Sequence, residues 1–455
     1  MTTTVFKGNS PPISSMEDLL RHFREGEKPR ERWRIGTEHE KLPFSRHTHQ
    51  PLAFGGERGI FAILEGLRTR FGWLPVREGE NVIALTRGEA SITLEPGGQL
   101  ELSGAAVTSA HETCAELSQH VRELRELSED LEVVLLMVGR NPVVPSSDMP
   151  WMPKERYAIM RRYLPTRGDM ALDMMLSTCT VQTNIDYSDE ADMARKLRVA
   201  MGLSPFLTAL FASSPFVAGR PSGYLSSRAL VWEHTDPDRS GFVPGVFEPG
   251  FGYREYAEYA LDVPMFFIHR NGHYLDTSGR SFRSFLEEGL DGHSATVEDW
   301  ALHLTTLFPL VRVKQYIELR MADVGPLNMI CAFAAITRGL LYDDTALAEA
   351  EALLAPIAPE QFPALQVDAA RHALRAEALG RPFQDWARDM VRIAQGGLER
   401  LNAQDAIGEN EAKLLAPLHR ILASGKTLAD ELLELWEHKW GRKVTPIFDE
   451  ELVRF

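Results

Sequence analysis

Residues 91–104 alternate between apolar and polar side chains, and this period of two restricts the segment to an extended strand. Even positions hold Ile92, Leu94, Leu100 and Leu102, whereas odd positions hold Ser91, Thr93, Glu95, Gln99, Glu101 and Ser103. Successive side chains of a strand point to opposite faces, so one face is apolar and the other carries carboxylates. A solvated face usually includes Lys or Arg. The acidic row is therefore expected to face something other than water.

Three further segments show the same alternation. Their polar faces carry Arg32, Arg34, Glu38 and Glu40 in residues 32–40; Thr178, Thr180, Gln182, Asn184 and Asp186 in 178–187; and Arg312, Lys314, Tyr316, Glu318 and Arg320 in 311–321. If the four strands share a sheet, its polar face gathers Glu38, Glu40, Glu95, Glu101 and Glu318, with Gln182, Asn184 and Arg320 among them. Independent solvated faces of antiparallel strands show the same pattern, and that alternative stays open.

Five carboxylates in one partly enclosed site repel each other, by about 4 kcal/mol per close pair at an intermediate dielectric. Protonation relieves this repulsion, and so do hard divalent cations such as Mg²⁺, which prefer carboxylate oxygens. Carboxylates, Mg²⁺ and a polyphosphate together form a phosphoryl-transfer site. The chain has neither a Walker sequence nor a Rossmann glycine fingerprint. A metal-bridged phosphate on the sheet is therefore the expected way to hold a nucleotide.

Composition narrows the partners and the compartment. The 455 residues carry a net charge of −15, which disfavours nucleic acid and anionic membranes as partners. The apolar run at 133–139 is too short to cross a bilayer, and the first twenty residues resemble neither a signal nor a transit peptide. Three widely spaced cysteines without CxxC favour a reducing compartment over a disulfide scaffold. Together these features predict a soluble cytoplasmic protein.

The order of elements predicts an α+β protein. We expect a lead and helix in residues 1–30, a sheet-containing core in 31–330, and a helical region in 331–455 that packs on the core as part of one integrated domain. Helices are expected near 16–23, 57–70 and 105–130, a buried strand at 132–138, and a helix capped by Ser188. Residues 213–255 are rich in Gly, Pro and aromatics and predict a long irregular, functional segment.

Six segments in order give a family resemblance: RIGTEHEKLPF, ITLEPGGQLELSG, PKERYAIMRRYLP, DMMLSTCTVQTNIDY, GYLSSRALVWEHTDPDRSG and VKQYIELRMADVGP, between residues 34 and 326. The chain resembles the glutamate–cysteine ligases of the plant and proteobacterial type. The resemblance implies a glutamine synthetase-like fold, whose antiparallel sheet curls into a funnel for ATP and two or three Mg²⁺ ions. It also implies the reaction: ATP phosphorylates the γ-carboxylate of glutamate, and the cysteine amine displaces the phosphate to give γ-glutamylcysteine.

The resemblance assigns roles position by position. Glu38 and Glu40 match the first pair of metal ligands, and Glu95 and Glu101 match further acidic ligands. Glu318 matches another ligand, and Arg320 matches an arginine that faces substrate carboxylate or the phosphoryl group in transfer, a role that suits a forked guanidinium. By the same resemblance, the residues expected to line the funnel or to bind substrate or ATP are Gln182, Asn184, Arg228, Trp232, Arg239 and Arg320.

Several alternatives remain open at this level. Arg156, Arg161 and Arg162 are compatible with a merely solvated helix face, and Trp232 with a core aromatic. His39 and Cys179 point to the apolar side of their strands and are expected to be structural. Residues 250–300 contain no cysteine, so the disulfide switch of plant members is not expected. Rival functions are a ligase with another amine acceptor and a non-catalytic regulator that binds Mg-nucleotide; the expected assembly is a monomer or weak homodimer.

Overall fold

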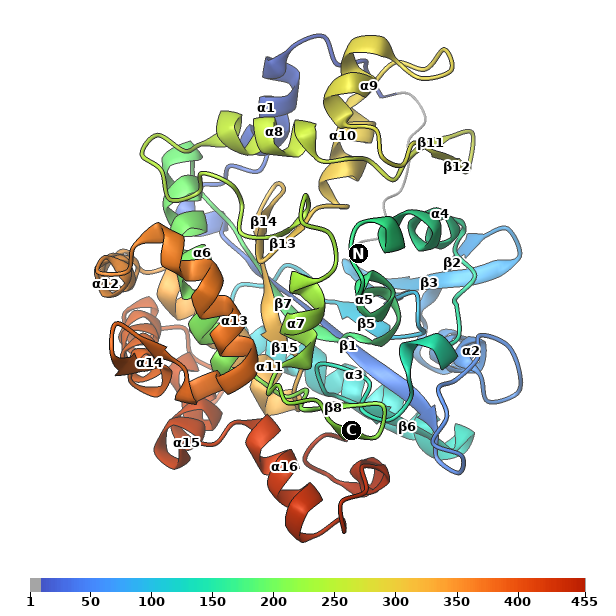
Figure 1. The fold of residues 1–455 in the computed structure, drawn as a ribbon, viewed down its shortest axis with the longest axis vertical. Helices are drawn as coiled ribbons and strands as arrows, with labels where there is room; N and C mark the ends of the chain where they lie inside the picture. Colours follow the sequence, from blue (N-terminus) through green and yellow to red (C-terminus); the bar gives the residue numbers. More distant parts are fainter. Residues whose placement is uncertain (1–9, 455) are drawn as a thin grey trace.

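A computed structural model describes residues 10–454. Its centre is an open antiparallel sheet with the strand order β14-β15-β7-β1-β5-β4-β3-β2, and β6 pairs with the far end of β1 (Figure 1). The strands are β1 (Ile35–Ser45), β2 (Leu74–Glu78), β3 (Asn81–Arg87), β4 (Ala90–Leu94), β5 (Leu100–Ser103), β6 (Val133–Leu136), β7 (Thr180–Ile185), β14 (Val311–Val313) and β15 (Ile317–Asp323). The α+β class expected from the sequence is confirmed.

Residues 91–104 form two strands, so the expected single strand is wrong. Pro96, Gly97 and Gly98 make a turn between β4 and β5, closed by a 3.0 Å hydrogen bond from the Glu95 N–H to the Gln99 carbonyl. Gly98 has φ +88°, which a glycine adopts without the Cβ strain of other residues. The two strands pair with Ile92 opposite Leu102, so the alternation between faces is kept.

Residues 311–321 are likewise two strands, because a turn at residues 314–316 folds β14 back onto β15. The helix after β7 is capped by Asp189 and not by Ser188. The Asp189 carboxylate accepts a 2.9 Å hydrogen bond from the Asp192 N–H, while the Ser188 N–H donates to the Asp192 side chain. Aspartate and serine have similar capping preferences, so local sequence does not separate neighbouring candidates.

Helices pack on both sides of this framework and fill the last third of the chain. They are α1 (Met16–Arg24), α2 (Ile60–Phe71), α3 (Ala110–Leu131), α4 (Glu155–Tyr163), α5 (Ala171–Ser177), α6 (Glu190–Leu210), α7 (Ser227–Glu233), α8 (Tyr253–Asp262), α9 (Phe282–Glu288), α10 (Val297–Leu304), α11 (Leu327–Leu341), α12 (Asp344–Leu354), α13 (Phe362–His372), α14 (Phe383–Leu401), α15 (Ala416–Ser424) and α16 (Leu428–His438). The segment 213–255 contains α7 within otherwise mostly irregular chain. The division at residues 30 and 330 stays a prediction.

Short two-stranded sheets lie within the loops. They are β8 (Phe216–Val217) with β9 (Arg220–Pro221), β10 (Ser240–Gly241) with β13 (Phe308–Pro309), β11 (Phe267–Arg270) with β12 (His273–Asp276), and β16 (Glu377–Ala378) with β17 (Arg381–Pro382).

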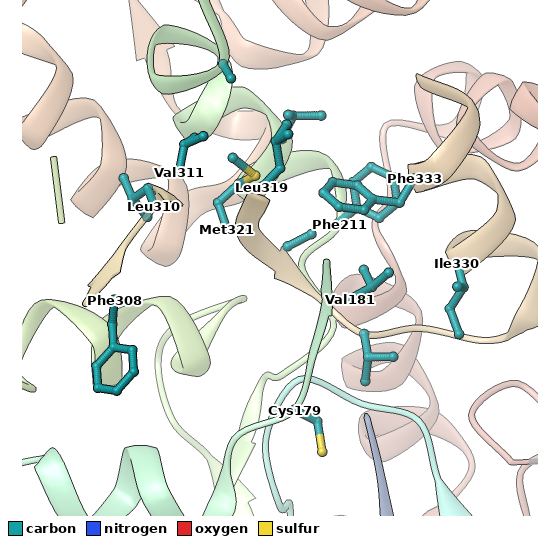
Figure 2. Packing of buried hydrophobic residues seen from close by; sticks show 14 of the residues in the cluster. Cys179, Val181, Phe211, Phe308, Leu310, Val311, Leu319, Met321, Ile330 and Phe333 are labelled. Carbon is teal, nitrogen blue, oxygen red and sulfur yellow. The ribbon is translucent and has the colours of Figure 1, made fainter. Parts of the chain in front are cut away.

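The apolar side of the sheet packs on helices α6 and α11. Figure 2 shows Val181 of β7 and Leu319 of β15 on the side of Phe211 and Phe333, whose rings meet edge to face at 5.1 Å. Cys179 is buried on this side, as expected. Burial of this face fixes the register of the strands, because a slip by one residue would expose every apolar side chain. The polar face of the sheet therefore points away from α6 and α11.

Cys114 in α3 and Cys331 in α11 form a disulfide, with their Cα atoms 5.6 Å apart. The expectation of a chain without disulfides is wrong for this pair, because α3 and α11 pack against each other and bring two residues together that lie 217 positions apart. Among residues 10–454, none of the helices combines the length and apolar character needed to cross a membrane.

Candidate active site

The strand register brings the predicted carboxylates to one face of the sheet. Glu40 lies opposite Glu101 on β5, and Glu38 lies opposite Gln182 on β7. Glu318 on β15 lies opposite Asn184 on the other side of β7. Directly paired residues of neighbouring strands project from the same face. All four carboxylates are buried, and Glu95, just after β4, is buried beside them.

These carboxylates perturb one another. Burial raises the pKa of Glu38, and the charges of Glu318 and Glu101 raise it further. Burial also raises the pKa of Glu40 to about 8, with added repulsion from Glu101 and Glu95. Two donors offset part of this repulsion: the Asn184 amide donates to Glu38 at 3.0 Å, and the Thr180 N–H donates to Glu40 at 2.8 Å. Glu38 and Glu40 therefore hold their protons more readily than free glutamates do.

The row of buried carboxylates supplies oxygen ligands of the kind that Mg²⁺ takes. Within residues 10–454, however, no three His, Cys, Asp or Glu side chains converge closely enough to hold a metal ion as they stand. The strands fix the backbone positions of Glu38, Glu40 and Glu101, whereas the carboxylates at the ends of their side chains turn about staggered rotamers. The donor set fits a divalent cation, and the metal role of these residues stays a prediction.

Glu318 differs from the other carboxylates because three cations surround it. Arg312 Nη2 lies 2.7 and 2.8 Å from the two Glu318 oxygens, Lys314 Nζ lies 2.9 Å away, and Arg320 also forms an ion pair with it. Burial acts to raise the pKa of Glu318, but the three positive charges hold it well below its usual range. Its charge is thus balanced without a metal. Arg312 and Lys314 were not predicted as site residues, although they share its face in the period-two pattern.

A pocket of about 530 Å³, measured out to its mouth, opens on this face. Glu40, Glu95, Gln182, Arg228, Trp232 and Arg320 are among its lining residues. Arg320 Nη1 donates a 2.6 Å hydrogen bond to Gln182 Oε1, and its guanidinium lies 5.8 Å from the centre of the Trp232 ring. Trp232 Nε1 is buried, and none of the described residues accepts a hydrogen bond from it. Such an orphaned donor at a pocket wall suits a ligand acceptor.

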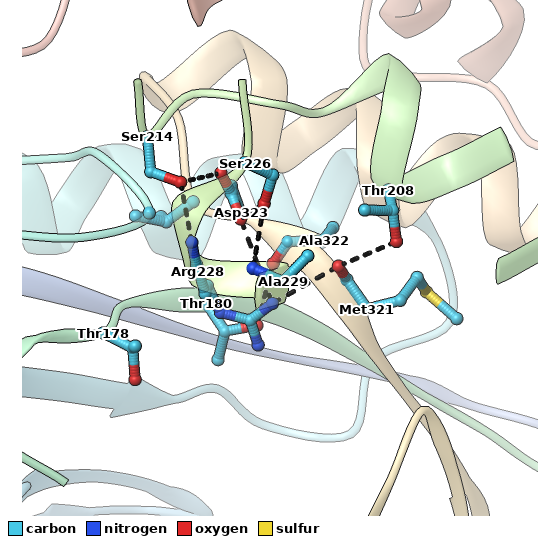
Figure 3. A network of polar contacts seen from close by, with 12 residues as sticks. Thr178, Thr180, Thr208, Ser214, Ser226, Arg228, Ala229, Met321, Ala322 and Asp323 are labelled. Carbon is cyan, nitrogen blue, oxygen red and sulfur yellow. Dashed lines mark hydrogen bonds and ion pairs between the residues drawn. The ribbon is translucent and has the colours of Figure 1, made fainter. Parts of the chain in front are cut away.

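Arg228 lines the same pocket and also ties together its walls. Its guanidinium donates to the Arg320 carbonyl at 2.8 Å and to the Met321 carbonyl at 3.3 Å, and it lies 4.0 Å from Asp323 (Figure 3). Asp323 accepts hydrogen bonds from the hydroxyls of Ser214 at 2.6 Å and Ser226 at 2.8 Å. Ser226 caps α7, the helix of Arg228 and Trp232. Asp323 therefore anchors the start of α7 against β15, a role that no local pattern indicated.

The structure does not bring Arg239 into this pocket. Its guanidinium donates to the Asp236 carboxylate at 2.7 Å and to the carbonyls of Thr306 at 3.1 Å and Pro264 at 2.6 Å. It is fully buried and lies 3.9 Å from the centre of the Phe266 ring. These contacts make Arg239 a brace between three loop segments. Its expected contact with substrate has no support in this geometry.

Three comparisons with known proteins show the family and the fold of this chain. The family model "Glutamate-cysteine ligase family 2" matches residues 34–449. The chloroplastic glutamate–cysteine ligase of Nicotiana tabacum is 44% identical over 96% of this chain and 82% of its own, and that of Arabidopsis thaliana is 43% identical with the same coverage. A crystal structure of glutamate–cysteine ligase from Francisella tularensis in complex with AMP shares the fold, with TM-score 0.56, 13% identity, and coverage of 91% and 86% of the two chains.

These relatives correct one expectation. The sequence alone predicted a cytoplasmic protein, and that prediction is wrong by this comparison, because relatives at 43–44% identity are named chloroplastic and point to the plastid. An ordinary soluble composition is common to both compartments, so it does not distinguish them. The expected ligase resemblance, by contrast, is confirmed over nearly the whole chain. The chain belongs to glutamate–cysteine ligase family 2.

Proposed function

We propose that this protein joins the γ-carboxylate of L-glutamate to the amine of L-cysteine at the expense of ATP. The product is γ-glutamylcysteine, and the reaction is the first step of glutathione biosynthesis. The observation that carries the proposal is the buried carboxylate face with Arg320 and Trp232 at its pocket, in a chain of this family. The AMP in the Francisella structure, which shares this fold, supports a nucleotide as substrate.

The reaction proceeds through a γ-glutamyl phosphate. The γ-carboxylate oxygen attacks the terminal phosphorus of ATP and releases ADP, and the cysteine amine then attacks the acyl carbon and expels phosphate. Glu38, Glu40, Glu95 and Glu101 would hold two or three Mg²⁺ ions, which would supply positive charge to neutralise the phosphates. Glu318 would become a further metal ligand only after a bound anion had drawn Arg312, Lys314 and Arg320 away from it.

The remaining residues position the anions. Arg320 is held by Gln182 and Glu318, so its guanidinium meets substrate carboxylate or the transferring phosphoryl group in a fixed orientation. Trp232 offers its unused indole N–H to the same ligand. Arg228 keeps α7 and β15 at a constant separation through two backbone carbonyls. Low solvent access around these groups strengthens their electrostatic effect on developing charge.

The direct test is to purify the protein and mix it with glutamate, cysteine, ATP and Mg²⁺. ADP release is measured together with γ-glutamylcysteine by mass spectrometry, and α-aminobutyrate, alanine and ammonia replace cysteine in parallel reactions. Cysteine is expected to give the highest kcat/KM. A clear preference for another amine would replace the acceptor assignment, and ADP release at background with every amine would favour a non-catalytic nucleotide-binding protein.

The assembly is proposed as a monomer or weak homodimer. Light scattering of the purified protein across a hundredfold range of concentration measures this directly, and a stable higher oligomer would contradict it.

A further inference from the structure

Arg312 joins the carboxylate face to a neighbouring loop. It lies on β14, the edge strand of the sheet, directly opposite Glu318 on β15, and its side chain is almost fully buried. Its Nη2 bonds both oxygens of the Glu318 carboxylate, and its Nε lies 3.3 Å from one of them. Its Nη1 donates to the carbonyls of Thr305 at 2.7 Å and Leu307 at 2.8 Å. One guanidinium thereby connects the loop at residues 305–307 to the sheet.

These contacts use every donor of Arg312. A guanidinium has five N–H groups, and the five hydrogen bonds just described engage all of them. Arg312 therefore has no donor left for a substrate. Arg320 differs, because among residues 10–454 its side chain bonds through Nη1 alone, to Gln182 and Glu318. The Nε and Nη2 donors of Arg320 stay available for a ligand.

Two arginines share the carbonyls of this loop. Arg312 binds the Thr305 and Leu307 carbonyls. Arg239 binds the Thr306 carbonyl between them at 3.1 Å. The other hydrogen bonds of the Arg239 side chain run to loop residues, and within the described chain none of them reaches a carboxylate of the sheet. Both arginines brace the loop, but only Arg312 links it to the carboxylate face.

Both ends of the Arg312 guanidinium lead to the pocket. Glu318, at one end, also pairs with Arg320. The loop at the other end continues directly into Phe308, which lines the pocket with Trp232 and Arg320. The Phe308 ring lies 5.9 Å from the Arg320 guanidinium carbon, and the Trp232 ring lies 5.7 Å from the Phe308 ring and 5.8 Å from Arg320. Arg312 is thus bonded to the supports of two neighbouring groups in the pocket wall.

We propose that Arg312 is a positioning residue, which fixes Arg320 and Phe308 relative to each other in the pocket. A planar guanidinium with five partners is a rigid connector. The orientation of Arg320 matters because a displacement of about 1 Å near reacting atoms can cost about a hundredfold in rate. Arg312 acts through Glu318 and the loop and does not touch substrate. The inference rests on the proposed function for the reaction that Arg320 serves.

The first test examines the resting pocket and does not depend on ligation. Arg312→Lys keeps a positive charge for Glu318 but has too few donors for the carboxylate and both carbonyls. Trp232 is the reporter, because its ring contacts both groups that Arg312 is proposed to fix. The chain has eight tryptophans, so the emission of Trp232 is taken as the difference between each protein and the same protein with Trp232→Phe.

Arg312→Lys is expected to shift the emission maximum of Trp232 without any ligand, because the charge of Arg320 and the ring of Phe308 are no longer fixed beside it. Arg239→Lys is the matched control. It loosens the same loop through the Thr306 carbonyl without contacting Glu318, and it is expected to leave the emission of Trp232 unchanged. Arg312→Gln is a second variant of the site, and thermal unfolding identifies which variants are folded at the assay temperature.

The second test asks whether Arg312 acts through Arg320. Arg312→Lys alone is expected to lower kcat/KM for glutamate by about tenfold or more, and Arg239→Lys by less than about twofold. Arg312→Lys combined with Arg320→Lys is expected to stay within about threefold of Arg320→Lys alone, since a lysine at position 320 has no fork left to orient. Two independent losses would instead multiply, as they do for uncoupled sites.

Three outcomes would overturn the proposal. They are an unchanged emission of Trp232 in both Arg312 variants, an equal shift in Arg239→Lys, and losses in kcat/KM that multiply in the double variant. Failure of the proposed function looks different. If the wild-type protein makes no γ-glutamylcysteine, the ligase assignment is lost, and the emission of Trp232 still decides whether Arg312 fixes the pocket wall.

Discussion

Arg320 on β15 donates a 2.6 Å hydrogen bond to the Gln182 side-chain oxygen on the adjacent strand β7. The same guanidinium pairs with Glu318 two residues earlier on its own strand. Two fixed partners on two strands leave the forked group little freedom to rotate. An arginine held in this way at a pocket wall is pre-organised for an anion.

Replacing Arg320 by lysine tests this pre-organisation. Lysine keeps the charge but loses the fork, so we expect kcat/KM to fall by about a hundredfold while ATP still binds. Steady-state kinetics with glutamate varied provide the measurement. Arg162→Lys, at an exposed arginine that pairs with Asp276, is the control and is expected to change kcat/KM by less than about twofold. Wild-type kinetics in Arg320→Lys would show that the arginine only balances charge in the sheet.

Glu38→Gln and Glu318→Gln are expected to change stability in opposite directions. Glu38→Gln relieves repulsion and keeps an acceptor for Asn184, so the melting temperature without metal or nucleotide should hold or rise while ligation is mostly lost. Glu318→Gln leaves Arg312 and Lys314 without their carboxylate, which costs about 3–5 kcal/mol for a broken buried ion pair.

Thermal unfolding without ligands measures the change in stability, and ADP release at saturating Mg²⁺ measures the loss of ligation. Glu40→Gln is expected to behave like Glu38→Gln. Near-wild-type turnover in both the Glu38 and Glu40 variants would remove the metal assignment. An unchanged melting temperature in Glu318→Gln would mean that its three cations find other partners.

Arg239→Lys separates a structural role from substrate binding. Lysine cannot reach Asp236 and the two carbonyls at once, so the variant should lose about 2 kcal/mol or more of unfolding free energy. Because Arg239 does not line the pocket, the KM values for glutamate, cysteine and ATP should stay within about twofold. Denaturant unfolding and steady-state kinetics on the same preparation check both halves. A raised KM at unchanged stability would return Arg239 to the substrate site.

His303 gives a pH prediction with a defined sign. Burial lowers its pKa to about 3, against a smaller opposite effect of its hydrogen bond to the Ala260 carbonyl. The unfolded chain therefore binds a proton that the folded chain rejects between pH 6.5 and 3. Stability present above pH 6.5 is lost as pH falls through this window, by about 1.4 kcal/mol per pH unit from this residue.

His303→Gln lacks the titrating ring, so its unfolding free energy should fall less steeply with acid than that of the wild type. Denaturant unfolding at pH 7, 6, 5 and 4 measures the slopes. The exposed His438→Gln is the control and should follow the wild type. Parallel slopes for His303→Gln and the wild type would mean that the ring is protonated in the folded protein.

The sequence by itself determined which side chains share a face. Alternation along a strand is a local property of the extended backbone, so the polar sides of β1, β5, β7 and β15 could be predicted even though two expected strands proved to be hairpins. A tight turn joins antiparallel strands without exchanging their faces when the register is kept. Glu38, Glu40, Glu101 and Glu318 therefore remained together on one side.

Only the tertiary structure decided which charges each of these groups meets. Asp323 anchors α7 through Ser226 and Ser214, which lie 97 and 109 positions away in the chain. Arg239 donates hydrogen bonds to loop segments that no local sequence pattern connects. Arg156 is buried while Arg161 is exposed, although both belong to the same basic run on α4. Partner choice depends on contacts between distant segments, where burial makes an unpaired charge costly, and that cost is set by the assembled core and not by neighbouring residues.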